Sequence, residues 1–572
     1  MAAVQEVEVK RLLMVAAALV AALVLVGVLA SALDDAPPAT VRRPTVRMAD
    51  GTRLAVDVVL PDPVAGPVPV VLLQTRYWRS FALKVPEDPG RVPKGPREPV
   101  VEALVRAGYG VVVADVRGTG ASEGHWPHPF GEQEAKDGEA LIDWVSKQPF
   151  CDGRVGATGL SYEGTTALLA AATRHPALKA VLARDLEWDL VDELLAPGGV
   201  RNRSFPDAWG RAVSALDRGT APELFPAGAR WLIENVHPVD GDEDGAALRA
   251  LQQGRVVADV ARAVGQVRAP GDAFGAGGPP AGSLGPSSRE GLAGATAVVS
   301  LWGSWFDGAT ADAVLRASAA MPLREAVIGP WEHEGHATAS PFGGRADATV
   351  ELARIVAFFD RHLKCDTASA PERRWWVAGA ERWELAAAWP KTQAVAHGFE
   401  FEPARLDVDF SASTGRRNRW MTGMAQPVEY EDRRAAKGLL RASGPVRRAA
   451  LRFFGAPQVA CEVALDGPEA ALHVYLEEVG AVGAVTVLTE GVRRVQPGPV
   501  TLPLRAVAAE LPTGGRLQLS VAGADAPTFE RVPAEGPRVI TLVGACTLTL
   551  PERVPPAAGP VDDAFARERG AP

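Results

Sequence analysis

Residues 154–164 read Arg154-Val155-Gly156-Ala157-Thr158-Gly159-Leu160-Ser161-Tyr162-Glu163-Gly164. An apolar segment leads into a serine between glycines, and an alanine- and leucine-rich segment over 165–175 follows. This order predicts a strand, a tight turn and a helix, which is the arrangement of a nucleophile elbow. In such an elbow the Ser161 hydroxyl protrudes above the sheet edge, where N–H groups at the start of the helix can stabilise an oxyanion. The usual G-x-S-x-G spacing is not met, because Glu163 fills the fifth place and the glycine follows at Gly164.

Strand and helix patterns alternate along the chain before this turn. Residues 40–60 predict a hairpin whose tight turn lies at 49–52. Buried strands are predicted at 68–73 and 109–115, and helices at 99–107 and 134–147. Such alternation is typical of a mostly parallel sheet covered by helices, so the predicted fold class is α/β.

The pattern changes after the serine helix. Residues 189–296 hold helical pieces between loops rich in glycine and proline, and predict a cap inserted over the sheet. Helical pieces are expected at 207–216 and 245–264, later strands at 297–302 and 325–328, and a helix at 350–363. Beyond His397, short apolar or alternating runs, the last of them at 539–550, predict a β-sandwich.

With 572 residues the chain is too long for a single core. We therefore expect consecutive parts with different structures. They are an N-terminal membrane anchor or signal peptide (1–40), the first part of the α/β-hydrolase domain (41–188), the helical cap (189–296), the second part of the α/β-hydrolase domain (297–396), the C-terminal jelly-roll β-sandwich (397–556) and a loose tail (557–572).

The N-terminus carries an export signal of one of two kinds. Lys10 and Arg11 precede an uncharged run, residues 12–33, made almost wholly of Leu, Val and Ala, and a bilayer-spanning helix needs about 20 apolar residues. The basic pair would keep the short N-terminus in the cytoplasm and place the rest of the chain outside. A small-x-small cleavage site near Ala32 makes a secretory signal peptide the alternative. The length of the run favours an uncleaved anchor, and both interpretations predict an exported protein.

Composition and cysteine spacing argue against nucleic-acid binding and against a metal site. The formal net charge of −9 is modest for this length and argues against nucleic acid as a partner. No C-x-x-C or Cys/His metal spacing is present, and residues 333–336 do not form H-E-x-x-H, so no metal site is predicted. Cys461 and Cys546 both lie in strand-like runs and can pair, but buried free thiols are the favoured interpretation.

A serine nucleophile needs a histidine base and an acid that orients the imidazole. In α/β-hydrolases the acid and then the histidine follow the serine in sequence, each just after a later strand. Asp307 and His333 each come directly after a predicted strand, in that order. Ser161, Asp307 and His333 are therefore the predicted catalytic residues, and His336 is the nearest alternative histidine.

Several stretches together resemble one enzyme family. They are the Asp50-Gly51 hairpin, Gly118-Thr119-Gly120-Ala121-Ser122-Glu123-Gly124, Cys151-Asp152-Gly153-Arg154-Val155-Gly156, Trp305-Phe306-Asp307-Gly308, Gly329-Pro330-Trp331-Glu332-His333 and Leu488-Thr489-Glu490-Gly491. From about Thr45 to Leu550 the chain resembles the serine hydrolases typified by bacterial cocaine esterase, Xaa-Pro dipeptidyl peptidases and α-amino acid ester hydrolases. In that family a glycine falls three residues after the serine, as Gly164 does here.

The resemblance implies an α/β-hydrolase domain with an inserted helical cap and a C-terminal jelly roll, which in this family can pack against a neighbouring subunit of a homo-oligomer. It also implies that Tyr77 matches a tyrosine whose hydroxyl forms the oxyanion hole beside the backbone N–H of Tyr162. From its sequence context alone, Tyr77 is better explained as an aromatic residue at an interface. The implied chemistry is cleavage of an ester, amide or peptide bond through an acyl-enzyme, with no metal or organic cofactor.

The substrate stays open at this stage. A carboxylesterase of the cocaine esterase type is favoured, with Trp188, Trp209, Trp302 and Trp331 expected to line an apolar pocket. A Xaa-Pro dipeptidyl peptidase and an α-amino acid ester hydrolase are the alternatives. A non-catalytic surface binding protein on the same fold is the third hypothesis.

The α-amino acid ester hydrolases bind a substrate ammonium with carboxylates, some of which lie two and three residues after the catalytic aspartate. Ala309 and Thr310 occupy those places here, so that half of the carboxylate cluster is missing. An acidic run with Asp189, Asp192 and Glu193 is another source of negative charge, although a solvated helix face explains it better.

Overall fold

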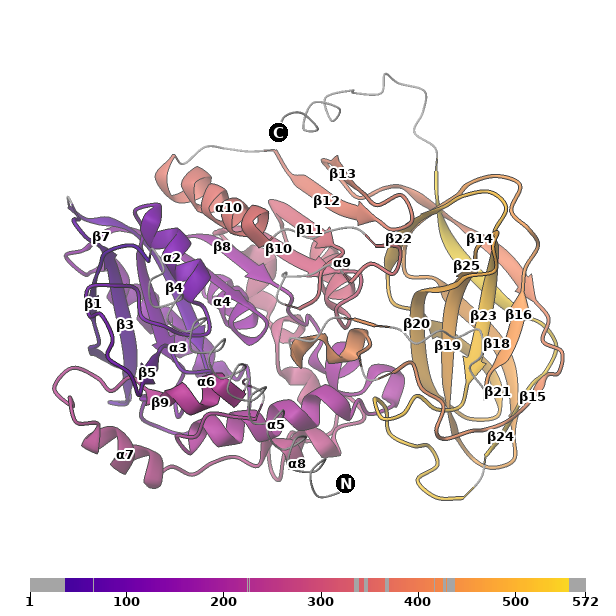
Figure 1. The fold of residues 1–572 in the computed structure, drawn as a ribbon, viewed down its shortest axis with the longest axis horizontal. Coiled ribbons are helices and arrows are strands. Elements are labelled where there is room, and N and C mark those ends of the chain that lie inside the picture. Colours follow the sequence, from indigo (N-terminus) through magenta and orange to yellow (C-terminus); the bar gives the residue numbers. More distant parts are fainter. Residues whose placement is uncertain are drawn as a thin grey trace, which may run out of the picture.

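The computed structural model describes residues 36–554, except 65, 224, 226, 334–338, 344–347, 366–369, 416, 425–427, 430–437 and 537. The apolar run at 12–33 and the tail at 557–572 lie outside the described residues, as does His336. Within the described ranges, no helix is both long and apolar enough to cross a membrane. Figure 1 shows an α/β half, an all-β half and, along one side of the α/β half, the cap helices.

One mixed sheet forms the α/β half, and its central strands are parallel. Its order is β1 (Ala39–Arg42), β3 (Arg53–Pro61), β6 (Gly110–Asp115), β4 (Val68–Thr75), β7 (Cys151–Leu160), β8 (Leu178–Arg184), β10 (Val298–Ser304), β11 (Glu325–Gly329), β12 (Glu372–Val377) and β13 (Arg382–Ala386), with β2 (Thr45–Arg47) paired to β3. The predicted hairpin, the two buried strands and the strand before Ser161 are all confirmed.

Helices cover both faces of this sheet. On one face α2 (Glu98–Arg106) and α10 (Ala348–Phe359) pack on the strands. On the other face lie α3 (Glu132–Ser146), α4 (Tyr162–Ala172) and α9 (Thr310–Ala320). The small residues of α4 let it lie buried on nearly all sides, directly against β7 and β8. A parallel sheet with both faces covered has strands that are largely apolar, and β6 is buried throughout and apolar up to Asp115.

Strands β8, β12 and β13 and helix α9 are among the elements of this half that were not predicted from the sequence. Strand β8 carries Lys179 near its start and Arg184 at its end, so its uninterrupted apolar run is short. Helix α9 begins at Thr310, shortly after Asp307, and no helix was predicted there. Strand β8 matters for function, because it brings further acidic residues to the same sheet edge as Ser161.

The cap contains α5 (Ser204–Asp217), α6 (Ala227–Leu232), α7 (Ala246–Gln253) and α8 (Val260–Gln266). The single helix predicted at 245–264 is wrong, because the chain leaves the helix at Gly254 and starts again at Asp259. The Asp259 carboxylate accepts the Arg262 N–H at 3.1 Å and so caps α8. Strand β9 (Ile233–Val236) of the cap pairs with β5 (Phe81–Leu83), which ties the cap to the loop after β4.

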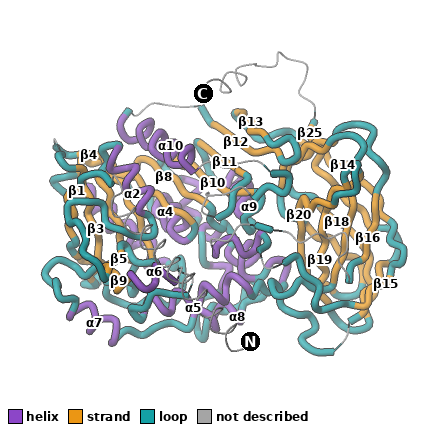
Figure 2. The backbone as a smooth tube through the Cα atoms, in the orientation of Figure 1, coloured by secondary structure: helices purple, strands orange, loops and turns teal. Residues whose placement is uncertain are grey.

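The C-terminal half is a β-sandwich, and Figure 2 shows strands and loops predominating there. One sheet holds β15 (Arg405–Asp407), β24 (Val539–Leu542), β18 (Gln458–Leu465), β25 (Cys546–Arg553), β17 (Leu451–Gly455) and β22 (Val507–Leu511), with β14 (Thr392–Phe399) and β21 (Gly498–Pro503) at its sides. The other holds β16 (Leu440–Ser443), β23 (Arg516–Ala522), β19 (Ala470–Val479) and β20 (Val485–Val495). The single run predicted at 539–550 is two strands, since Gly544 turns the chain with a positive φ of 75°.

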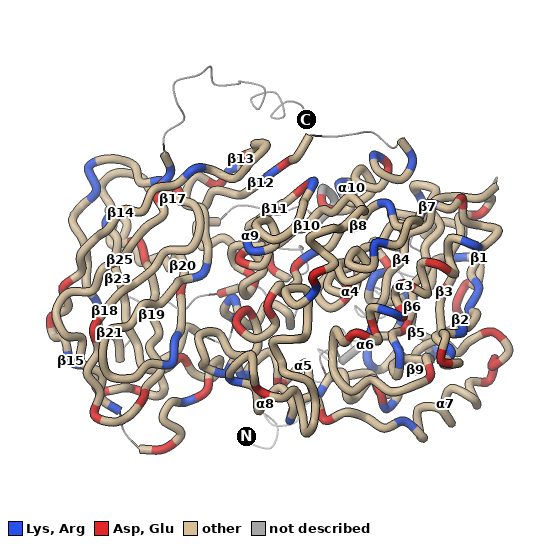
Figure 3. The backbone as a smooth tube through the Cα atoms, turned by 180° about the vertical axis from the view of Figure 1, so that it is seen from behind, with Lys and Arg blue, Asp and Glu red and all other residues tan. Residues whose placement is uncertain are grey.

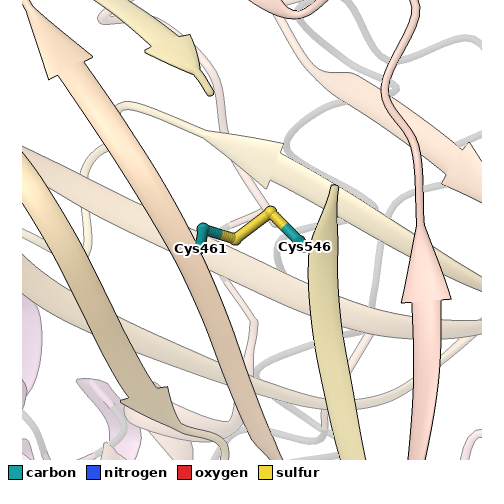
Figure 4. The surroundings of a disulfide bond; sticks show 2 residues. All are labelled: Cys461 and Cys546. Atoms are coloured by element: carbon teal, nitrogen blue, oxygen red, sulfur yellow. A yellow bond between two sulfur atoms is a disulfide. The ribbon is translucent and has the colours of Figure 1, made fainter. Parts of the chain in front are cut away.

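Cys461 and Cys546 form a disulfide, so the preferred interpretation as free thiols is wrong for this pair (Figure 4). Strands β18 and β25 are antiparallel neighbours, with Ala460 opposite Thr547, and this register places the two cysteines opposite each other. Their Cα atoms are 4.5 Å apart, and both side chains are buried. Pairing could not be read from the sequence because it depends on which strands become neighbours. Cys151 and Cys365 are free thiols.

Candidate active site

Ser161 lies in a strained backbone conformation at the end of β7. Its φ of 61° and ψ of −123° are rare for a residue with a side chain, and strain of this kind marks a nucleophile elbow. A Cβ on Gly159 would approach the carbonyl carbon of Glu163 to 2.3 Å, and one on Gly164 would approach the Arg184 oxygen to 2.7 Å. The turn therefore requires glycine at both positions, 159 and 164.

The carboxyl edge of the parallel sheet gathers the predicted catalytic residues. Ser161, Asp307 and His333 follow β7, β10 and β11, which lie near one another in the sheet. His333 Nδ1 lies 2.8 Å from Asp307 Oδ2, and both side chains are buried. Because an ionised carboxylate can only accept, the Nδ1–H donates and Nε2 is left as the basic nitrogen. Among the described residues, His333 and the Ser161 hydroxyl are not joined by a hydrogen bond.

Electrostatics at this edge favour a protonated His333. Burial by itself would lower the pKa of the imidazole, but the carboxylate of Asp307, with smaller contributions from Asp185 and Glu187, raises it to about 9. Burial and the negative charge of Asp307 raise the pKa of Asp185 to about 8. Burial also raises the pKa of Glu187 to about 7, against the opposing effect of His333. Near neutral pH, His333 and Asp185 are therefore protonated, and Glu187 is partly protonated.

Tyr77 and the start of α4 supply donors beside Ser161. Tyr162 is the first residue of the helix, so its backbone N–H has no acceptor within the helix. The Tyr77 hydroxyl accepts the Trp209 Nε1–H at 2.9 Å, which leaves its own proton free to donate. Burial raises the pKa of Tyr77 to about 12, so the phenol stays protonated over the working pH range. The predicted oxyanion donors therefore lie on the same side of the elbow, where Tyr77 and Ser161 line one pocket.

The Tyr162 side chain is held by a separate buried network. Its hydroxyl donates to Glu134 Oε1 at 2.5 Å and accepts the Trp126 Nε1–H at 3.0 Å. Burial raises the pKa of Glu134 to about 7. Since Tyr162 begins α4, this network fixes the helix start on which the Tyr162 N–H is presented.

A narrow, mostly apolar pocket opens over Ser161. Cap residues supply most of its wall, and Glu187 is the charged residue among those that line it. The lining residues are Tyr77, Pro129, Phe130, Ser161, Tyr162, Glu187, Leu190, Leu194, Leu195, Phe205, Pro206, Trp209, Val264 and Phe274.

The predicted tryptophan lining is correct only for Trp209. Trp188, Trp302 and Trp331 are buried in the hydrophobic core and do not line this pocket. Trp302 and Trp331 pack on each other with ring centroids 6.3 Å apart, and Trp331 donates to Asp185 at 3.3 Å. Tryptophans at the end of a buried strand fill the core, while the cap builds the pocket wall from aliphatic and phenyl side chains.

The acidic run after β8 is structural, and the acidic residue of the pocket lies just before it. Glu193 is buried and accepts the backbone N–H groups of Trp188 and Asp189 at 2.6 and 3.0 Å. Asp192 pairs with Arg316 at 2.7 Å. The acidic residue that lines the pocket with Ser161 is instead Glu187, which was not predicted from the sequence because β8 was not predicted.

The described residues show neither a metal site nor a concentration of one charge. No set of three or more His, Cys, Asp or Glu side chains is placed there to hold a metal ion. Figure 3 shows basic and acidic residues interspersed over both halves of the molecule. The predictions of no cofactor and no nucleic-acid partner stay predictions.

Comparison with known proteins assigns the family. Residues 50–335 match the X-Pro dipeptidyl-peptidase (S15 family), and residues 366–545 match the X-Pro dipeptidyl-peptidase C-terminal non-catalytic domain. A Mycobacterium bovis protein named as a serine esterase is 30% identical over 585 residues, which cover 86% of this chain and 92% of that protein. The chain belongs to the S15 family.

A further curated relative of this S15 family member is an esterase, and two solved structures share its fold. The cocaine esterase of a Rhodococcus strain is 28% identical over 368 residues, which cover 60% of this chain and 59% of that protein. The structure of an α-amino acid ester hydrolase matches with a TM-score of 0.67 at 19% identity, covering 91% of this chain and 97% of that one. An aminopeptidase from a Thaumarchaeota archaeon matches with a TM-score of 0.66 at 19% identity over the same shares. The chain is a serine hydrolase with an α/β-hydrolase domain followed by an all-β domain.

Proposed function

We propose that this serine hydrolase cleaves carboxylic esters through a triad of Ser161, His333 and Asp307. The observation that carries the proposal is the strained elbow at Ser161 on the same sheet edge as the buried His333–Asp307 pair. Ser161 Oγ attacks the substrate carbonyl carbon while His333 Nε2 takes the hydroxyl proton. The same nitrogen then returns the proton to the leaving alcohol, and water hydrolyses the acyl-enzyme by the reverse sequence.

The oxyanion would be stabilised by the Tyr77 hydroxyl and the Tyr162 backbone N–H. The N–H is unpaired within α4, and Trp209 occupies a lone pair of the phenol oxygen so that its proton can point at the substrate. A donor that is already oriented loses little entropy when charge develops on the carbonyl oxygen. Asp307 keeps the imidazole in the tautomer that leaves Nε2 basic.

The apolar pocket favours an ester whose acyl or alcohol group is apolar. Leu190, Leu194, Leu195 and Phe205 are among the side chains over Ser161, and burial of apolar surface contributes about 25 cal/mol per Å². The name of the Mycobacterium bovis relative agrees with an esterase. We therefore place a simple carboxylesterase first.

A second candidate is an ester or amide whose acyl group carries an amine, and Glu187 is the observation that favours it. Its carboxyl lines the pocket with Ser161, and a substrate ammonium would restore the charge that burial disfavours. Xaa-Pro dipeptidyl peptidase or α-amino acid ester hydrolase activity would then follow. The absence of carboxylates at Ala309 and Thr310 weighs against both.

We also propose that the protein is exported and that its catalytic part works outside the cytoplasm. The apolar run at residues 12–33 supports export, as an anchor or as a signal peptide. The disulfide between Cys461 and Cys546 agrees with an oxidising compartment. Fractionation of cells, with the N-terminus of the mature protein sequenced, would separate membrane anchor, secreted protein and cytoplasmic protein.

The test of the catalytic proposal compares the wild type with Ser161→Ala. Substrates are p-nitrophenyl esters with short, long and aromatic acyl groups, an amino-acid ester and a Gly-Pro anilide. We expect ester turnover that the substitution abolishes, together with labelling of the wild type alone by a fluorophosphonate. Equal labelling and turnover in Ser161→Ala would disprove the role of Ser161. Silence of both proteins on every substrate and probe would favour a binding protein on the same fold.

A further inference from the structure

Asp307 uses its two carboxylate oxygens for two different partners. Oδ2 faces His333 Nδ1 at 2.8 Å, and the hydroxyl of Thr310 lies 3.5 Å from the same oxygen. Oδ1 accepts a hydrogen bond from the hydroxyl of Thr422. Among the described residues, Thr422 supplies the hydrogen bond to Oδ1. Asp307 and Thr422 are 2% and 1% exposed, so water cannot easily replace this contact.

Thr422 comes from the C-terminal half, 115 residues after Asp307. It lies in a 3-10 helix, Arg419–Met424, between the strands β15 and β16 of the β-sandwich. The Thr422 hydroxyl has one proton and two acceptors within reach, Asp307 Oδ1 and the carbonyl oxygen of Arg419, which lies 2.8 Å from Thr422 Oγ1. That carbonyl already accepts the Gly308 N–H at 2.8 Å, and a carboxylate is the stronger acceptor. The proton therefore goes to Asp307.

The same helix also forms hydrogen bonds to the backbone of the loop that carries Asp307. The Arg419 guanidinium is 1% exposed and donates to the carbonyl oxygens of Trp305 and Gly308, the latter at 2.9 Å. Together with the Gly308 N–H bond, these contacts fix the backbone on both sides of Asp307. The orientation of the Asp307 carboxylate thus depends on where this helix sits.

The helix itself is anchored in the β-sandwich by buried polar contacts. Asn418 donates to Thr528 Oγ1 at 2.7 Å and accepts the Trp420 N–H at 3.1 Å. Trp420 Nε1 donates to Glu490 of β20 at 2.6 Å. The hydroxyl of Tyr475 of β19 donates to Asp525 at 2.8 Å, and Asp525 also accepts from Thr414. These hydrogen bonds tie Thr414, Asn418 and Trp420 to the β-sandwich, including its strands β19 and β20.

We propose that the C-terminal domain completes the active site, with Thr422 as the positioning residue for Asp307. The Thr422 hydroxyl orients the Asp307 carboxylate so that Oδ2 faces His333 Nδ1, and it supplies a hydrogen bond to the buried Oδ1. This inference rests on the proposed triad. It assigns a role in positioning the triad to a domain whose family description is non-catalytic.

The test uses the full chain with Thr422→Val, which removes the hydroxyl at nearly constant volume, and Thr422→Ser, which keeps it. A hydrogen bond to a charged group contributes about 1.5–3 kcal/mol, which corresponds to a roughly 10- to 160-fold lower kcat for the valine variant. KM should stay close to the wild-type value, because Thr422 does not line the pocket. The serine variant should keep most of the wild-type kcat. The control is Thr489→Val, which removes another buried threonine hydroxyl of the same domain.

Several outcomes would overturn the inference. A wild-type kcat in Thr422→Val would show that the hydroxyl is not needed, and an equal loss in the serine variant would assign the effect to packing. A comparable loss of kcat in Thr489→Val would mean that the effect comes from a less stable domain. Thermal unfolding of each variant measures that stability. If the valine variant does not fold, Thr422→Ala replaces it with the same expected fall. Activity that survives Ser161→Ala would refute the triad, whereas a silent Ser161→Ala beside an unaffected Thr422→Val refutes this inference alone.

Discussion

Raising the pH is expected to increase ester turnover strongly, because the base His333 is protonated at rest. With a pKa of about 9, only about one imidazole in a hundred is neutral near pH 7. The value of kcat/KM should therefore rise roughly tenfold per unit between about pH 7 and about pH 9 and level off above that. Asp307 is the main source of this shift, and Asp185 and Glu187 add to it.

The assay is the pH profile of kcat/KM on a p-nitrophenyl ester, with Ser161→Ala as the blank for spontaneous hydrolysis. Glu187→Gln removes one negative charge, so its midpoint should lie at lower pH than that of the wild type. Stability should change in the opposite direction. A shift of His333 from 6.5 to about 9 stabilises the fold by about 3 kcal/mol below about pH 6.5, and this is lost as the pH rises through about 9. A wild-type midpoint at or below about 6.5 would refute the reasoning.

Three further predictions concern stability and the oxyanion donors. Trp209→Phe keeps an aromatic ring in the pocket but loses the hydrogen bond from Trp209 to the Tyr77 hydroxyl. We expect a kcat about 3- to 10-fold lower in steady-state assays, and a change in KM alone would contradict this expectation. Gly159→Ala places a Cβ 2.3 Å from a backbone carbon, so the variant should not yield phosphonate-reactive protein, and normal labelling would refute the tight elbow. Replacing both Cys461 and Cys546 with serine opens a cross-link over 85 residues and should cost about 4 kcal/mol in denaturant unfolding, while an unchanged midpoint would argue against the bond.

Features that depend on residues close together in the sequence could be predicted from it. The turn around Ser161 and the places of Asp307 and His333 were predicted from strands followed by polar residues, and the structure puts those residues at one sheet edge. Glu187 was missed because it follows β8, whose short apolar run gave no clear strand pattern. Thr422 could not have been found, since its contact joins residues 115 apart and no local pattern marks it.

The structure separates the determinants of substrate fit from those of acid–base behaviour. The leucines of the pocket wall and two of its phenylalanines, Phe205 and Phe274, come from the cap and carry no charge, so changes there should alter the preferred acyl group without moving the pH midpoint. The charges that set the pKa of His333 come from the loops after β8 and β10 at the sheet edge. Glu187 belongs to both groups, because it lines the pocket and also interacts with His333. If an ammonium substrate neutralises Glu187, the midpoint measured on that substrate should fall toward the value of Glu187→Gln. A neutral ester should leave it unchanged, so comparing the two profiles discriminates the two candidate substrate classes even where both are hydrolysed.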